Sequence, residues 1–278
     1  MGRVTTRVRR TRFDVDTGDR VDRTDTVAVE EPLEIRVGDE PLTTTMRTPG
    51  DDFDLSIGHL LTEAMLHSAC EVGTLMHCTD LDEDGSPTFN VVDVTLAPGA
   101  VLHRPARART ETISSACGVC GSATIDAVRT NSRFAIGDDD VAVAPRVLAG
   151  LPGALRARQA VFDRTGGVHA AGLATPDGEL LVVREDVGRH NAVDKVVGAA
   201  ARERELPFTA AVLVVSARAS IEIVQKASVV GIPVVVAVGA ASSLAVDLAT
   251  SAGITLVAFA RPPHLSVYSR PDRLLAGR

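Results

Sequence analysis

The sequence AAVLVVSARASIEIVQKASVVGIPVVVAVGAASSLAVDLATSAGITLVAFA, residues 210–260, decides the fold. Three short apolar and β-branched runs, typical of buried strands, occupy residues 210–215, 234–238 and 255–259. Two segments with helical spacing of their apolar residues occupy residues 219–230 and 244–252. Gly, Pro and Ser separate the two kinds of segment. Strands that alternate with helices in this way predict an α/β domain with helices covering a sheet.

The same alternation extends toward the N-terminus as far as residues 100–112. Pro176, Asp177 and Gly178 separate two strand-like segments and predict a β-hairpin. The remaining expectations are a helix over residues 191–205, two or three strands within 1–48, a helix starting near 48–52, a loop over 69–87 and a strand over 89–96. We therefore predict a smaller N-terminal α+β domain, residues 1–109, and an α/β sheet domain, residues 110–278, that carries a Cys-x-x-Cys loop.

The composition excludes several classes of protein. The chain has 278 residues and a net charge of −7, which argues against a nucleic-acid binder that neutralises phosphates. With seven Phe, one Tyr and no Trp, it also lacks the aromatic residues of a single-strand platform. The uncharged segment 227–246 is interrupted by Gly, Pro and Ser, so we interpret it as a helix end, a buried strand and a helix start, not a membrane span. No export signal is visible, and we expect a cytoplasmic protein.

Two of the four cysteines form the sharpest local feature, SSACGVCG at residues 114–121. Glycines beside Cys117 and Cys120 let another molecule approach the sulfurs. If a helix follows, its first turn lowers the pKa of a nearby thiol and raises the thiolate fraction. One thiol of the pair could attack sulfur carried by the other, which would release sulfide. A zinc site is the alternative, with His67, Cys70, His77 or Cys78 as further ligands, and the motif alone leaves thiol chemistry and metal binding open.

Three polar segments follow strand-like segments or precede helices: RTGGVH at 164–169, REDVGRHN at 184–191 and SARAS at 216–220. In open α/β sheets, ligands bind beyond the carboxyl ends of the strands, so we expect these loops to form one ligand site. A further corner, FARPPH at 259–264, follows the last strand of the opening stretch. Phe259 could stack on a nucleobase or pterin and Arg261 could bind a phosphate. A strand edge ended by Pro is the other interpretation of that corner.

Together these segments resemble the FdhD family of sulfur carrier proteins, accessory factors for formate dehydrogenase. The resemblance covers most of the chain and is specific as a combination. It rests on RTPGD at 47–51, GHLLTEA at 58–64, CGVCG at 117–121, TGGVH at 165–169, EDVGRHNAVDK at 185–195, SARAS at 216–220 and FAR at 259–261.

The resemblance implies a sulfurtransferase that works through a cysteine persulfide. Such proteins take sulfur from a cysteine desulfurase and pass it to the molybdenum of the bis(molybdopterin guanine dinucleotide) cofactor before that cofactor enters formate dehydrogenase. It implies that Cys117 carries the persulfide with Cys120 as its partner. The implied cofactor-binding residues are Phe259, Ala260, Arg261, Pro262, Pro263 and His264.

The resemblance also implies a homodimer and a cytidine deaminase-like main domain. The chain has Ala116 before Cys117 and no His-x-Glu or Cys-x-Glu zinc signature, so we expect no catalytic metal of its own. The alternative function is a molybdenum cofactor-binding chaperone whose Cys pair is structural or binds metal.

Overall fold

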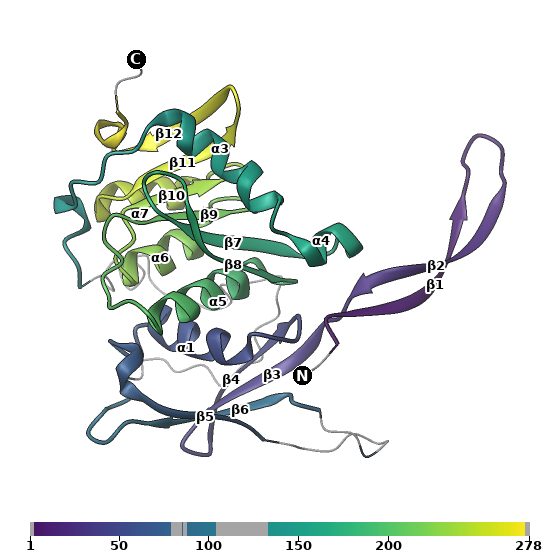
Figure 1. The fold of residues 1–278 in the computed structure, drawn as a ribbon, viewed down its shortest axis with the longest axis horizontal. Helices are drawn as coiled ribbons and strands as arrows, with labels where there is room; N and C mark the ends of the chain where they lie inside the picture. The colour runs from purple at the N-terminus through teal and green to yellow at the C-terminus, as the bar shows by residue number, and fades with distance from the viewer. Residues whose placement is uncertain (1–2, 79–84, 86–87, 104–132, 276–278) are drawn as a thin grey trace.

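A six-stranded mixed sheet forms the centre of the computed structural model, which describes residues 3–78, 85, 88–103 and 133–275 (Figure 1). The strand order is β12-β11-β10-β9-β7-β8. Strands β9, β10 and β11 are parallel to one another, whereas β7, β8 and β12 are antiparallel to their neighbours. The bounds are β7 His169–Ala174, β8 Leu180–Asp186, β9 Val212–Val215, β10 Val234–Ala237, β11 Thr255–Arg261 and β12 His264–Ser269.

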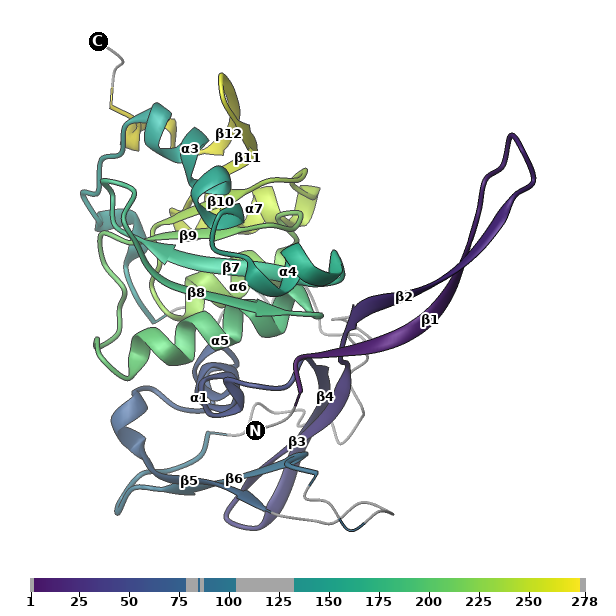
Figure 2. The ribbon, with the colours of Figure 1, turned by 45° about the vertical axis from the view of Figure 1, so that its right-hand side comes forward.

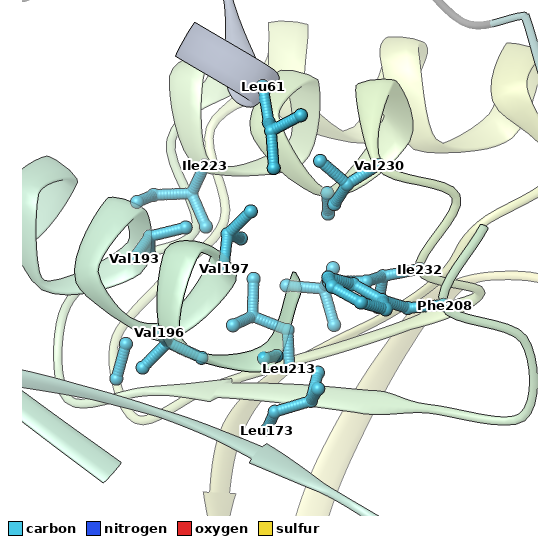
Figure 3. Close-up of a cluster of buried hydrophobic side chains, with 14 of the residues drawn as sticks. Leu61, Leu173, Val193, Val196, Val197, Phe208, Leu213, Ile223, Val230 and Ile232 are labelled. Atoms are coloured by element: carbon cyan, nitrogen blue, oxygen red, sulfur yellow. The ribbon is translucent and has the colours of Figure 1, made fainter. Parts of the chain in front are cut away.

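Helices cover both faces of this sheet because its strands are apolar on both sides. In β9, Leu213 and Val215 belong to one buried cluster, and Val212 and Val214 belong to the other. The first cluster lies under α5, α6 and α7, and Figure 3 shows part of it. The second lies under α3. The bounds are α3 Pro145–Arg156, α4 Ala160–Thr165, α5 Arg189–Ala201, α6 Ile221–Val229 and α7 Ser243–Ala252.

A second sheet lies on the far side of α1 and α5, as both ribbon views show (Figures 1 and 2). Its strand order is β4-β3-β6-β5. Helix α1 packs between this sheet and α5, and its Leu60 and Leu61 join the same buried cluster as Ile35 of β3 and Val197 of α5. The bounds are β3 Glu31–Val37, β4 Glu40–Arg47, α1 Asp52–Thr62, β5 Val72–Cys78 and β6 Val91–Leu96.

A separate hairpin, β1 Thr5–Phe13 and β2 Arg20–Ala28, projects from the body of the molecule (Figures 1 and 2). It forms its own two-stranded sheet, and its nine-residue strands pair without interruption. Most of its residues are exposed. The hairpin therefore adds nothing to the buried clusters.

The predicted α/β class is confirmed by these sheets and helices, and by a hairpin at residues 175–179. Segment 227–246 contains the end of α6, then β10 and the start of α7, as expected, and no helix of the described residues is long and apolar enough to cross a membrane. The loop expected over residues 69–87 is wrong in part, because β5 pairs with β6 there. Within the predicted range 1–48, the described residues 3–48 form four strands rather than two or three. The cytidine deaminase-like layering and the boundary between residues 1–109 and 110–278 stay predictions.

Two glycines let α1 and α5 approach each other closely. A Cβ placed at Gly58 would lie 1.8 Å from the backbone oxygen of Asp194, and one at Gly198 would lie 1.9 Å from that of Asp54. Neither glycine has a positive φ, so the constraint is space and not backbone conformation.

We predict that Gly58→Ala and Gly198→Ala each lower the free energy of unfolding by about 3 kcal/mol, because backbone atoms must move apart to admit the methyl group. Urea unfolding followed by circular dichroism measures this loss. Gly150→Ala in α3 is the matched control, since nothing lies within 4 Å of its Cβ position. It should be neutral or stabilise by about 0.5–1 kcal/mol. Equal effects at the three positions would contradict the packing argument.

Candidate functional site

A cavity of about 620 Å³ lies at the carboxyl edge of the six-stranded sheet. Strands β9, β10 and β11 end there: Ser216 directly after β9, Val238 directly after β10 and Arg261 at the end of β11 line the cavity. Val187 after β8 and His169 at the start of β7 complete this side. The three predicted loops 164–169, 184–191 and 216–220 therefore do converge on one cavity, at the edge where an α/β sheet binds ligands.

Helices α3 and α4 form the opposite wall. The Arg156 guanidinium lies 4.6 Å from the centroid of the Phe162 ring, and its Nη1 lies 2.6 Å from Asp163 Oδ1. The backbone N–H groups of Val161 and Phe162 donate to the Glu185 carboxylate at 2.8 and 2.9 Å. This carboxylate binds the exposed N–H groups of the first turn of α4, so it fixes α4 against β8.

Sequence reasoning missed this wall, although a signal was present. Pro145 stands at the first turn of α3, a position that favours Pro. Leu148, Leu151 and Leu155 follow at helical spacing, and all three are buried. This amphipathic pattern would have predicted α3.

His169 adds a neutral ring to the cavity. Burial, and to a smaller extent the nearby Arg189, lowers the pKa of His169, whereas Asp186 opposes that effect. At neutral pH the imidazole is therefore uncharged and can both donate and accept a hydrogen bond. Next to it, Ser216 Oγ accepts a hydrogen bond from the Ala170 N–H at 2.9 Å, which fixes that side chain at the edge of the cavity.

Of the six predicted cofactor-binding residues 259–264, two line the cavity and four, including Phe259, do not. Ala260 and Arg261 line the cavity. Pro262, Pro263 and His264 are exposed at the turn between β11 and β12 and are not among its lining residues, so the structure does not bring them to this site.

Phe259 has an unusual conformation. Its φ is +51°, a region that non-glycine residues rarely adopt, and its side chain is 48% exposed. Its N–H donates to the Gly239 oxygen at 3.1 Å, which links β11 to the loop after β10. The β11–β12 register shifts between Ala258 and Arg261. Phe259 itself is not among the residues that line the cavity, although the two residues that follow it are. Its exposed ring and rare backbone conformation mark it as a candidate ligand contact at the rim.

The two predicted catalytic residues, Cys117 and Cys120, lie outside the described residues. Cys70 and Cys78 are described, and both are free thiols. Within the described ranges, no group of three or more His, Cys, Asp or Glu side chains is arranged to hold a metal ion.

Most of the EDVGRHNAVDK segment is a buried scaffold instead of a ligand site. Asp186 is fully buried; its carboxylate lies 2.8 Å from Lys195 Nζ and accepts the Thr48 N–H at 3.1 Å. Burial raises the pKa of Asp186, while Lys195 acts in the opposite direction. Lys195 Nζ also donates to the Thr48 oxygen at 2.8 Å. These bonds fix the turn before α1 to β8 and α5, and within this segment Val187 alone lines the cavity.

A second buried network joins α1, α5 and α6. Lys226 Nζ donates to Asp194 Oδ2 at 3.0 Å, to Thr62 Oγ1 at 2.9 Å and to Glu63 Oε1 at 3.1 Å. Burial by itself would raise the pKa of Asp194, but Lys226 and His59 lower it to about 2. Asp194 is therefore ionised and paired throughout the physiological range.

The FdhD/NarQ family model matches residues 28–275. The chain is 52% identical over 275 residues to the sulfur carrier protein FdhD of Streptomyces avermitilis, which covers 99% of this chain and 97% of that protein. It is 51% identical over 257 residues to the protein of the same name from Mycobacterium tuberculosis, with 91% and 93% coverage.

Among solved structures, the chain is similar to a crystal structure from Desulfotalea psychrophila, described as that of a candidate formate dehydrogenase accessory protein. The TM-score is 0.75 at 23% identity, over 98% of this chain and 100% of the other. This likeness supports the fold, including the arrangement of the two larger sheets.

His190 gives the scaffold a predicted pH dependence. Burial, then the charges of Lys226 and Arg189, lowers the pKa of His190 to about 4, although Glu222 and Asp194 oppose the shift. An unfolded histidine has a pKa near 6.5, so the folded state disfavours the proton. The stabilisation is complete above about pH 6.5 and is lost as the pH falls toward 4.

We predict that wild-type protein loses about 2 kcal/mol more stability than His190→Asn between pH 7 and pH 5. Urea unfolding at the two pH values gives both differences, so any constant effect of the substitution cancels. The other histidines are common to both proteins. Parallel stability profiles for the two proteins would contradict the assignment.

Proposed function

The chain belongs to the FdhD/NarQ family, and we propose that it acts as a sulfur carrier for the maturation of formate dehydrogenase. In this proposal it is a sulfurtransferase that takes persulfide sulfur from a cysteine desulfurase. It passes that sulfur to the molybdenum of the bis(molybdopterin guanine dinucleotide) cofactor, which is its cargo. The names of the relatives and the description of the structural neighbour support this assignment. A cytoplasmic homodimer with a cytidine deaminase-like main domain is part of the same proposal.

The Cys117 thiolate accepts the sulfur. It attacks the outer sulfur of the desulfurase persulfide, and the desulfurase cysteine leaves as its thiolate. Cys117 then carries a persulfide. Attack by the Cys120 thiolate on the inner sulfur, that of Cys117, forms a Cys117–Cys120 disulfide and releases the outer sulfur as sulfide. Two equivalents of an external thiol, which leave as their own disulfide, return the pair to the reduced state.

The observation that carries the cargo assignment is the placement of Arg261 in the lining of the cavity; Phe259, which does not line it, stands two residues earlier in β11. A guanidinium binds phosphate oxygens through paired hydrogen bonds, and an exposed aromatic ring offers a face to a guanine. Among the described residues, no Asp or Glu lines the cavity, and the nearby Asp163 carboxylate is paired with Arg156. Among the described lining residues, phosphate groups of a guanine dinucleotide would therefore meet no unpaired carboxylate.

The persulfide predicts a specific mass change. After incubation with a cysteine desulfurase and cysteine, mass spectrometry should find one added sulfur on Cys117. Cys117→Ala should lose this addition and should fail to restore formate dehydrogenase in cells that lack the carrier. Cys70→Ala is the control, because Cys70 is an exposed thiol of the same chain and should retain both. Restoration of activity by Cys117→Ala would reject the catalytic assignment; restoration by the double variant at 117 and 120 would favour the cofactor-binding chaperone.

The cavity predicts binding of GDP, which carries the guanine and the diphosphate of the cargo. Arg261→Ala should weaken binding by roughly tenfold or more, since it removes charge-assisted hydrogen bonds worth about 1.5–3 kcal/mol. Phe259→Ala should weaken it by a smaller factor, about threefold. Isothermal titration calorimetry measures both. Arg146→Ala, an exposed arginine on α3 that does not line the cavity, is the matched control. Equal losses for Arg146→Ala and Arg261→Ala would contradict the site.

A further inference from the structure

The projecting hairpin β1–β2 has two different faces. Residues opposite each other in an antiparallel pair point to the same side, so the register assigns every side chain to one face. We call one the cavity-side face: Arg7 is opposite Thr26, Arg9 opposite Thr24, Thr11 opposite Asp22 and Phe13 opposite Arg20. The other is the outer face: Val8 is opposite Asp25, Arg10 opposite Arg23 and Arg12 opposite Val21.

The cavity-side face is named for its contacts at the root of the hairpin. Thr5 and Ala28 belong to this face, and Thr5 Oγ1 accepts a hydrogen bond from Arg164 of α4. A Cβ at Gly167 would lie 3.8 Å from the Ala28 Cβ. Because Gly167 also lines the cavity, the hairpin begins directly beside the cavity wall. The root of this face therefore adjoins the cavity wall, while the rest of the arm extends away from it.

The hairpin lacks the packing that normally stabilises two strands. A two-stranded hairpin is marginal in water without a third strand or a covering element. The Phe13 side chain is 62% exposed near the tip. Within the described part of the chain, Arg7, Arg9 and Arg20 make no ion pair. On the outer face Arg10 lies 3.1 Å from Asp25, while Arg12 and Arg23 make none among the described residues, so the two faces differ in charge pairing by this one contact and in aromatic content by Phe13. The cavity-side face thus presents three unpaired guanidinium groups and an aromatic ring.

Arginine and exposed aromatic side chains are enriched at protein interfaces. The charges fit carboxylates on a partner. A nucleic acid or an anionic bilayer fits less well, because Asp14, Asp16 and Asp19 lie at the hairpin tip and the chain has a net charge of −7. The observations therefore favour an acidic protein surface over a polyanion.

We propose that the cavity-side face of β1–β2 is a docking arm for an acidic surface of the acceptor protein that receives the cargo of the cavity. This inference rests on the proposed function, since it requires an acceptor. Docking on the arm brings the acceptor to the mouth of the site, and Arg7, Arg9 and Arg20 supply the attraction that orients it. The family model begins at residue 28, the last residue of β2, so the arm lies outside its match.

The test compares the two faces by charge reversal. The probe is the formate dehydrogenase encoded by the same genome, purified without its cofactor, and binding is measured by microscale thermophoresis. We expect Arg7→Glu/Arg9→Glu/Arg20→Glu to weaken binding at least tenfold. The matched control, Arg10→Glu/Arg12→Glu/Arg23→Glu, makes the same change in charge on the outer face and should remain within threefold of wild type. Wild-type binding should weaken as salt rises.

Several results would overturn the inference. They are an equal loss for the two variants, no loss for either, or no binding of wild-type protein to the acceptor. Conversion of a dimer to a monomer by the cavity-side variant, measured by sedimentation, would assign the arm to a second copy of the chain. Binding of wild type to DNA or phosphatidylserine vesicles that is lost in this variant would assign it to a polyanion. In each case persulfide formation at Cys117 would be unaffected, so failure of the arm is distinct from failure of the sulfur carrier.

Discussion

The close crossing of α1 and α5 is the constraint on which the rest of the structure depends. Gly58 and Gly198 bring the two helix backbones together at Asp194 and Asp54, and the side chains of those two aspartates hold the buried or half-buried charges around the crossing. A charge this deep needs partners at fixed positions, because an unpaired buried carboxylate is strongly destabilising. The close packing of the two helix backbones and the pairing of the buried charges at the crossing therefore depend on each other. Through Lys195 they also hold the end of β8, where the cavity begins.

The sequence predicts the six-stranded sheet well because its strands are buried on both faces. A continuous apolar run such as 234–238 permits few alternatives when Gly and Pro bound it. Strand β5 was missed because Gly73, Thr74 and His77 interrupt the apolar pattern, and its pairing with β6 decides its conformation. The projecting hairpin is a similar case. Its strands bury little, so hydrophobic periodicity carries no signal for their length or direction.

The position of the candidate site could be predicted from the sequence, but the residues that line it could not. The alternation of strands and helices predicts loops at the carboxyl ends of the strands, and the loops that were expected to converge do line one cavity. The strand order was not predicted. The polar residues of 184–191 were misleading because a carboxylate that binds a ligand and one that pairs inside the protein look identical in a sequence. Thr48 and Lys195 both contact Asp186, yet Thr48 is 138 residues away along the chain. Such a pairing exists only after the helices have crossed.

The charges of the cavity suit the carrier role proposed above, in which the bound cargo must be released. Arg156 is paired with Asp163 and stacked on Phe162, so part of its positive charge is already compensated. His169 is neutral at physiological pH because burial lowers its pKa. Arg261 makes no ion pair with any described residue, and it therefore remains as the lining cation available to an anionic ligand. When one guanidinium, that of Arg261, supplies most of the electrostatic attraction, an acceptor protein that competes for the ligand can draw it out of the cavity. A site with three free cations would hold a polyphosphate more tightly and would serve storage better than transfer.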